Sequence, residues 1–125
     1  MTLIRQGPGP NPLKGFQVDP AAMRFVGHDL QRPECILAER DGTLWSADAR
    51  GGVMRIAPDG AQTLVTQAPD PHFDLSASAA DSLLTGTLPN GLAFAANGDI
   101  LISNFGTDRL ERMTRGGETR VMLDS

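Results

Sequence analysis

The sequence is poor in cysteine, lysine and aromatic residues, and these shortages exclude several classes of protein. Cys35 is the only cysteine, which excludes an intramolecular disulfide and any metal site built from several cysteines. Lys14 is the only lysine, and the arginines are scattered from Arg5 to Arg120. With a formal net charge of −4, this leaves no basic patch. We therefore expect no binding to nucleic acid or to an anionic membrane surface.

Long apolar runs are also missing. No segment approaches the roughly 20 apolar residues that cross a bilayer, and residues 1–10 lack the apolar stretch of a secretory signal. We therefore expect a cytoplasmic protein. Hydrophobic residues make up 40% of the chain and charged residues 21%, a balance that is typical of a folded domain. Turn formers crowd residues 7–12, which predicts a flexible lead-in over 1–15 and a folded part over 16–125.

An internal repeat is the most informative feature that is present. Segment 33–48 (PECILAERDGTLWSAD) aligns without a gap with segment 89–104 (PNGLAFAANGDILISN). One extra residue in the next turn shifts the alignment, after which 53–60 aligns with 110–117. Apolar residues fall on apolar residues throughout. The chain therefore carries two copies of one structural unit.

Each copy predicts four short strands separated by turns. The expected strands run over 35–38, 43–48, 53–57 and 61–66, and over 91–95, 99–104, 109–114 and 118–123. Asp41-Gly42 and Asn97-Gly98 suit a type I′ turn, in which both central residues have positive φ. The second strand of each copy is almost continuously apolar, which predicts burial on both of its faces.

Four antiparallel strands per repeat are typical of a β-propeller blade. We expect an all-β fold with blade one over about 33–66 and blade two over about 89–123. An additional N-terminal strand is expected at 23–27, where polar and apolar residues alternate. A plain β-sandwich also contains many short strands, but the ungapped repeat favours the propeller.

The connection between the copies, residues 67–87, is polar and rich in small residues. Two structures are open for it. Residues 76–84 suit one or two helical turns with Asp74 as the N-cap, and the segment equally suits a mobile loop over one end of the barrel.

Glu34 and Asn90 are the candidate site residues. Each follows a proline and opens the first strand of its copy, at the same position of the repeat. The first strand of a propeller blade is innermost, so both side chains are expected at one mouth of the central channel. Carboxylate and amide oxygens are the ligands that Ca²⁺ and Mg²⁺ prefer, and a lone carboxylate in a channel needs a compensating cation. The competing interpretation is a solvated Glu34 and an Asn90 that merely forms a turn.

The residues around both positions resemble a known family. Arg32-Pro-Glu-Cys-Ile-Leu, the run from Asp41 to Ile56, Pro58-Asp-Gly, and Pro89-Asn-Gly-Leu-Ala-Phe followed by 97–104 are similar to the gluconolactonase, senescence marker protein and luciferin-regenerating-enzyme-like group. The resemblance covers roughly residues 16–125 and implies a six-bladed propeller with one divalent cation at the channel mouth. It implies a metal ligand at Glu34, and at Asn90 either a metal ligand or a contact to substrate. The implied cation is Ca²⁺, Zn²⁺, Mn²⁺ or Mg²⁺.

The family hydrolyses a sugar lactone or related ester, with the cation polarising the carbonyl and an aspartate of a later blade as general base. No aspartate of this chain has that repeat position, so no catalytic residue is assigned and the chain is interpreted as an N-terminal fragment. Asp48 and Asn104 end the second strands, a position typical of turns. The alternatives are a non-catalytic propeller that binds ligands or partners and a strictosidine synthase-like propeller. Self-association through exposed blade edges is also expected.

Other chemically capable side chains are interpreted as structural. His28 and His72 have no partners at metal or triad spacing, and Ser46 lies in no Gly-x-Ser-x-Gly motif. Cys35 is expected to be a small core residue. Trp45 and the phenylalanines are expected to pack within the blades.

Overall fold

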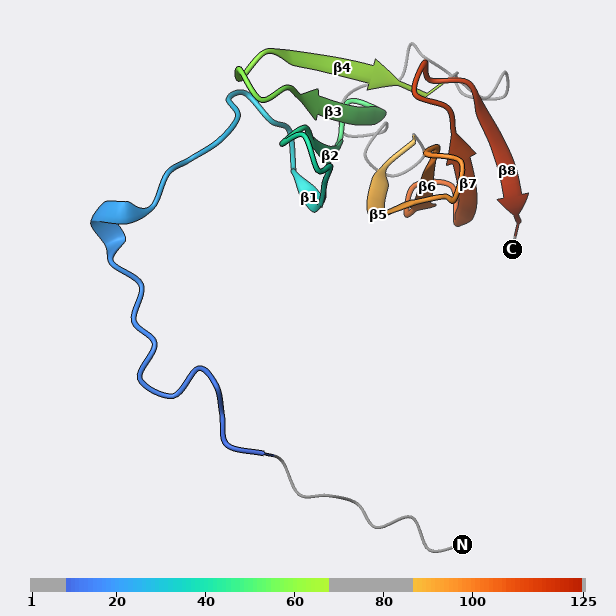
Figure 1. Ribbon diagram of the computed structural model, residues 1–125. Coiled ribbons are helices and arrows are strands. Elements are labelled where there is room, and N and C mark those ends of the chain that lie inside the picture. Colours follow the sequence, from blue (N-terminus) through green and yellow to red (C-terminus); the bar gives the residue numbers. More distant parts are fainter. Residues whose placement is uncertain (1–8, 68–86, 125) are drawn as a thin grey trace, which may run out of the picture.

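The computed structural model describes residues 9–67 and 87–124, and these form two four-stranded antiparallel sheets (Figure 1). In each sheet the strands follow one another in sequence order. The first sheet, blade one, contains β1 (Glu34–Ala38), β2 (Leu44–Asp48), β3 (Gly52–Ile56) and β4 (Gln62–Thr66). The second sheet, blade two, contains β5 (Pro89–Phe94), β6 (Ile100–Asn104), β7 (Arg109–Met113) and β8 (Thr119–Leu123). Each sheet corresponds to one predicted repeat.

The hairpin turns differ from the predicted type I′ geometry. At the first turn of blade one, the Gly42 N–H donates to the Glu39 carbonyl (3.1 Å) and the Glu39 N–H to the Thr43 carbonyl (2.8 Å). Only Gly42 has positive φ (92°), whereas Asp41 does not. This is a type I turn followed by a left-handed glycine. The Asp41 carboxylate accepts a hydrogen bond from the Thr43 N–H at 2.9 Å. This side-chain contact favours the observed turn type. The turns at Gly60, Gly98 and Gly117 repeat the same backbone pattern.

The hydrophobic core lies between the two sheets. It consists of the buried residues Trp45, Ala47, Val53, Leu92, Ile100, Ile102 and Met113. Burial of the second strand on both faces is confirmed for β2, where residues 45–48 are all buried, but not for β6, where Ser103 is exposed. The difference arises because Ser103 takes the repeat position of Ala47, which blade one buries against blade two, whereas that face of blade two points away from blade one. Residues 27–31 cover the other face of blade one. His28 exchanges hydrogen bonds with the Gln62 side chain (2.7 and 2.8 Å), and the Ala49 N–H donates to the Gln31 carbonyl (2.8 Å).

An arginine joins the two sheets at the end where β1 finishes. The Arg115 guanidinium pairs with Glu39 (2.5 Å) and lies over the rings of Trp45 and Phe94, 4.7 and 5.0 Å from their centroids. The Trp45 indole N–H also donates to Glu39 (2.6 Å). These hydrogen bonds, from Arg115 first and Trp45 second, hold the pKa of Glu39 below its ordinary value. Arg115 thus provides a cation–π contact between blades.

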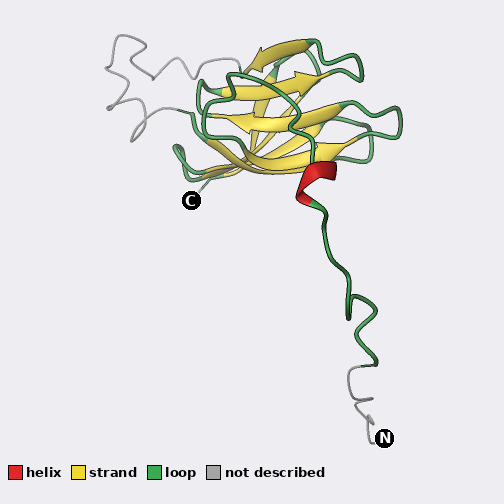
Figure 2. Ribbon diagram, turned by 90° about the vertical axis from the view of Figure 1, so that its left-hand side faces the viewer, coloured by secondary structure: helices red, strands yellow, loops and turns green. Residues whose placement is uncertain are grey.

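The expected strand at 23–27 is not formed. Residues 23–26 pair with no described strand, and Phe25 is fully exposed. A period-two pattern produces a strand only where a neighbouring edge offers hydrogen-bond partners, and here residues 9–26 extend away from both sheets (Figures 1 and 2). The only regular element described over residues 9–26 is the 3-10 turn η1 (Pro20–Ala22), which begins at the N-cap Asp19.

Several other expectations fall at the edges of the described residues. Of the predicted lead-in, residues 9–15 are exposed, and residues 1–8 lie outside the described part. The helical turns considered for 76–84, with Asp74, and the loop residue His72 also lie outside it. Across residues 9–67 and 87–124 the structure contains no helix of the length and apolarity needed to cross a membrane.

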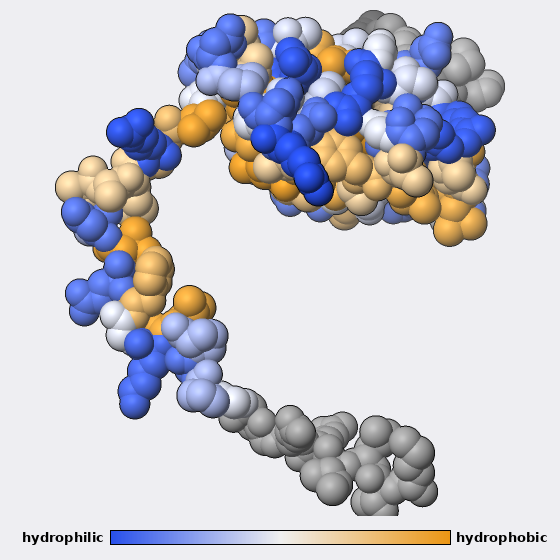
Figure 3. Space-filling model, in the orientation of Figure 1, coloured by the Kyte–Doolittle hydropathy of each residue, from blue (hydrophilic) through white to orange (hydrophobic). Residues whose placement is uncertain are grey.

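One face of blade two exposes aliphatic side chains. Leu110 takes the repeat position of Val53, yet Val53 is completely buried against blade two whereas Leu110 is 40% exposed. Leu123 pairs with Leu110 across the sheet and is 66% exposed. Apolar residues are visible at the C-terminal end of β8 in Figure 3. Blade two therefore presents the kind of surface that blade one buries.

We expect the chain to self-associate through this face because contiguous exposed apolar surface favours association. Leu123→Glu should lower the weight-average sedimentation coefficient at high protein concentration. Leu13→Glu is the matched control, since Leu13 in the lead-in is also 66% exposed and its substitution should change nothing. A sharp, concentration-independent melt together with monomeric sedimentation of the unmodified chain would contradict the prediction.

Candidate functional site

Glu34 and Asn90 meet at the starts of the two innermost strands. The pairing of β1 with β2 is irregular between Glu34 and Ile36, and that of β5 with β6 between Pro89 and Gly91. Such bulges redirect side chains and often lie beside functional sites. The Asn90 Nδ2 group donates a hydrogen bond to Glu34 Oε2 at 3.0 Å. Two equivalent positions of the repeat are therefore brought into direct contact.

Both carboxylate oxygens of Glu34 have a partner. Besides the bond from Asn90, Glu34 Oε1 accepts from Arg32 Nε at 3.1 Å. The side chains of Arg32 and Glu34 are 44% and 38% exposed, and an ion pair this accessible contributes little to stability. Glu34 is thus held in position but remains reachable from solvent.

The donor set fits a hard divalent cation in chemistry but not in number. Glu34 and Asn90 offer three oxygen atoms, whereas Ca²⁺ takes six to eight oxygen ligands. In this arrangement Asn90 presents its nitrogen to Glu34. The amide must therefore rotate before its oxygen can bind the same cation as the carboxylate. Within the described ranges, no group of three or more His, Cys, Asp or Glu side chains could complete a metal site. Glu34 and Asn90 by themselves therefore do not make a complete cation site.

The chain is similar in fold to proteins of known structure, but not in sequence to a known family. No family model and no curated protein matches the sequence. A solved structure of virginiamycin B lyase from Staphylococcus aureus, a catalytically inactive variant with quinupristin, matches with a TM-score of 0.53 and 22% identity over 75% of this chain. A candidate gluconolactonase matches with a TM-score of 0.50 and 23% identity over 78% of the chain.

The chain has a β-propeller fold. It covers 27% of the lyase chain and 36% of the candidate gluconolactonase chain, so it spans well under half of either structure. At these identities the likeness concerns the fold. One neighbour is described as a lyase and the other as a gluconolactonase, which agrees with the principle that one propeller architecture hosts several chemistries.

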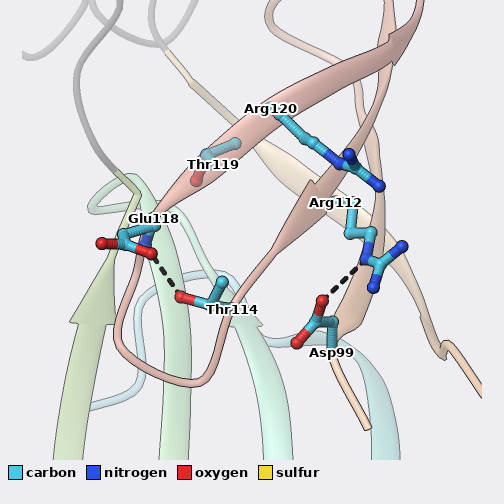
Figure 4. A pocket seen from close by; sticks show the side chains of 6 residues that line it. All are labelled: Asp99, Arg112, Thr114, Glu118, Thr119 and Arg120. Carbon is cyan, nitrogen blue, oxygen red and sulfur yellow. Dashed lines mark hydrogen bonds and ion pairs between the residues drawn. The ribbon is translucent and has the colours of Figure 1, made fainter. Parts of the chain in front are cut away.

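A shallow depression of about 390 Å³ lies beside Asn90 in blade two. It is lined by Asn90, Ser103, Asn104, Phe105, Asp108, Arg109 and Leu110. A second depression, of about 340 Å³, lies at the opposite end of the same blade (Figure 4). There Arg112 pairs with Asp99 at 2.7 Å and the Glu118 N–H bonds to Thr114 Oγ1 at 3.2 Å. Because these four residues bond to one another, this part of the second depression belongs to the turn structure.

Asp48 and Asn104 anchor the segments that lead into the first strands. Asp48 is fully buried and accepts the backbone N–H groups of Gln31 (3.2 Å) and Arg50 (3.0 Å). Asn104 Oδ1 accepts those of Leu88 (2.9 Å) and Gly106 (3.1 Å). The interpretation of both residues as structural agrees with these contacts. They therefore determine the positions at which the strands that carry Glu34 and Asn90 begin.

Asp48 also forms a bidentate ion pair with Arg50, with both N–O distances at 2.8 Å. Burial tends to raise the pKa of Asp48, but the hydrogen bonds from the Arg50 side chain and from the Arg50 and Gln31 N–H groups outweigh it. The net pKa therefore lies below its ordinary value of 3.8. At pH values above the ordinary pKa, the ionised carboxylate stabilises the fold. This contribution is lost as the pH falls through the lowered pKa of the folded chain.

We expect Asp48→Asn to destabilise the chain by about 1–2 kcal/mol near neutral pH, because one neutral acceptor replaces a charged one. Asp48→Ala should cost about 2–3 kcal/mol, since the two partly buried N–H groups and the Arg50 side chain lose their acceptor. Urea midpoints measured near neutral pH and at about pH 3 should converge for Asp48→Asn and the unmodified chain. The control Asp59→Asn, in an exposed turn, should change neither midpoint; a pH-independent deficit in Asp48→Asn would count against the role of the charge.

Cys35 is exposed, which corrects its expected place in the core. It lies at the bulge of β1 with a φ of 52°, a left-handed conformation that residues with a Cβ atom adopt at a cost. Its thiol donates to the Leu92 carbonyl at 3.5 Å across the two blades. Gly91 holds the equivalent position of blade two. The strain is thus associated with the redirection of Glu34.

Cys35→Gly should be more stable than Cys35→Ala by about 1 kcal/mol, because glycine removes the Cβ penalty at positive φ. Both variants lose the thiol hydrogen bond, so their difference isolates the backbone term. Thermal or urea unfolding measures it. Equal stability of the two variants would show that the bulge at position 35 is unstrained.

The remaining candidates behave as supports. His28 is held through its backbone by Gln62, and Ser46 is buried with its hydroxyl on the Ala47 carbonyl. Trp45 packs in the core as expected, but Phe16, Phe25, Phe94 and Phe105 are exposed, which corrects their expected role in packing. Phe73 lies outside the described residues. Arg32 was not singled out from the sequence, although its place two residues before Glu34 is the signal that points to it.

Proposed function

We propose that the chain supplies the first part of a divalent-metal-dependent, gluconolactonase-like lactone hydrolase, with Glu34 and Asn90 at the mouth of its channel. The observation that carries the proposal is the 3.0 Å contact between Glu34 and Asn90. It joins two oxygen-bearing side chains from equivalent, bulged strand starts. The candidate gluconolactonase among the fold neighbours supports the proposal at the level of architecture.

In this proposal Glu34 is a ligand of the cation, which is Ca²⁺, Zn²⁺, Mn²⁺ or Mg²⁺. A bound cation of this kind acts as a Lewis acid on a carbonyl oxygen. Asn90 either rotates its amide oxygen toward the same point or donates its N–H to the lactone substrate. Arg32 holds Glu34 from the other side, and its positive charge competes with a cation for the carboxylate.

The general base is proposed to lie on another blade, because no aspartate of the described ranges joins Glu34 and Asn90. The 125-residue chain alone should therefore show negligible lactonase activity with added Ca²⁺, Mn²⁺ or Zn²⁺. A second candidate function is a non-catalytic binding propeller. It is favoured by the fact that both oxygens of Glu34 already have N–H partners, which leaves the carboxylate satisfied without a metal.

Calorimetric titration with Ca²⁺ and Mn²⁺ separates the two functions. We expect weak binding, with a Kd on the order of millimolar, because most oxygen ligands are missing. Glu34→Gln should weaken binding at least roughly tenfold, whereas Arg32→Gln should strengthen it by removing the competing charge. Glu118→Gln, a carboxylate at the other end of blade two, serves as the control and should have no effect.

Absence of binding, or binding that Glu34→Gln leaves intact, would favour the non-catalytic module. Turnover of a sugar lactone by this chain that disappears in Glu34→Ala would instead show that the described blades contain a complete active site.

A further inference from the structure

A buried polar cluster lies between the blades beside the start of β5. It consists of Gln67, Thr87, Asn104 and Glu111, from the end of β4, the approach to β5, the end of β6 and the middle of β7. Glu111 and Gln67 are each 5% exposed and Asn104 is 2% exposed. A carboxylate this deeply buried is costly unless its oxygens accept hydrogen bonds, so its place in the sheet needs a reason.

Glu111 is the acceptor on which the cluster converges. Its Oε2 atom accepts from Asn104 Nδ2 (2.9 Å) and from Gln67 Nε2 (2.5 Å). Its Oε1 atom faces the Thr107 hydroxyl at 3.4 Å. In the described part of the chain these donors are all neutral side chains. Ion pairing with an arginine, the usual reason for a buried carboxylate, therefore does not explain Glu111.

The need to orient the Asn104 amide explains the buried carboxylate of Glu111 better. Asn104 must present its oxygen to the N–H groups of Leu88 and Gly106, but an amide has two similar ends. Turned over, it would direct its own NH₂ group at those N–H donors. A carboxylate accepts hydrogen bonds and offers no donor, so Glu111 favours the orientation in which Nδ2 faces it. The Phe105 N–H then completes the anchor by donating to the Leu88 carbonyl (2.9 Å).

The equivalent position of blade one supports this explanation. There the anchor is Asp48, which pairs with Arg50 and whose carboxylate has two acceptor ends, so it needs no second acceptor to orient it. The strand register places Met54 opposite Ser46 as it places Glu111 opposite Ile102, so Met54 is the counterpart of Glu111. An aspartate anchor is thus combined with methionine, and an asparagine anchor with glutamate.

We propose that Glu111 is a positioning residue that orients the Asn104 amide and thereby holds the segment Leu88–Asn90 in the place where Asn90 meets Glu34. The significance of that placement for a cation or substrate rests on the proposed function, whereas the positioning itself does not. Glu111 acts through Asn104 and has no contact with Glu34 of its own.

The proposal is tested by placing the blade-one residues Asp48 and Met54 at the equivalent positions of blade two, 104 and 111. Glu111→Met removes the carboxylate acceptor of Asn104 Nδ2 and leaves the Thr87 hydroxyl as its other acceptor (2.5 Å). The double variant Glu111→Met with Asn104→Asp restores an anchor that has two acceptor ends. Hydrogen exchange followed by NMR should show roughly tenfold faster exchange of the Leu88 and Gly106 amides in Glu111→Met, because a buried hydrogen bond weakens. The Asn90 side-chain NH₂ resonances should also shift. The double variant should return the exchange rates and the resonances toward their original values.

Ile100→Val is the control for a general loss of stability, because Ile100 is completely buried at the far end of β6. It should leave the Leu88, Gly106 and Asn90 signals unchanged relative to other core amides. Unchanged exchange in Glu111→Met, or a folded double variant without recovery, would overturn the positioning role. If the unmodified chain binds no cation in the titration above, the proposed function fails while the exchange result still decides the role of Glu111.

Discussion

The structure depends on one kind of contact, a buried Asx side chain at the end of the second strand of each blade. Asp48 and Asn104 accept backbone N–H groups both from the turn that follows and from the segment that enters the first strand. Each contact satisfies donors that are buried or partly buried and would otherwise cost free energy. Because the first strand is the innermost, the same contacts also determine where Glu34 and Asn90 stand.

The two blades are held together at both ends, by different kinds of interaction. At one end Arg115 spans the sheets by an ion pair and by cation–π contacts with Trp45 and Phe94. At the other end the cluster around Glu111 links β4 to β6 and β7 by hydrogen bonds between side chains. An aliphatic core lies between them. A relative tilt of the blades would break contacts at one end or the other, so the distance between Glu34 and Asn90 is constrained.

That constraint gives the candidate site its chemical meaning. In the proposed function, the two oxygen-bearing residues held side by side form a fraction of a cation shell, and a fold that repeats the same strand start around a channel is suited to add further ligands. The exposed aliphatic face at Leu110 and Leu123 has the same origin, since it repeats the face that blade one buries. Partial site and open face both follow from two blades of a repeating architecture.

The sequence by itself determined the repeat, the eight strands, their order and the equivalence of Glu34 with Asn90, because these follow from local hydrophobic patterns and from turn residues. It did not determine the turn type at Asp41, the absence of a strand at 23–27 or the exposure of Cys35. Those depend on which backbone groups find partners across space. Only the tertiary structure brought Arg115 to Trp45 and Glu111 to Asn104, since Trp45 and Arg115 lie on different blades and side-chain pairing leaves no periodic signal in a single sequence.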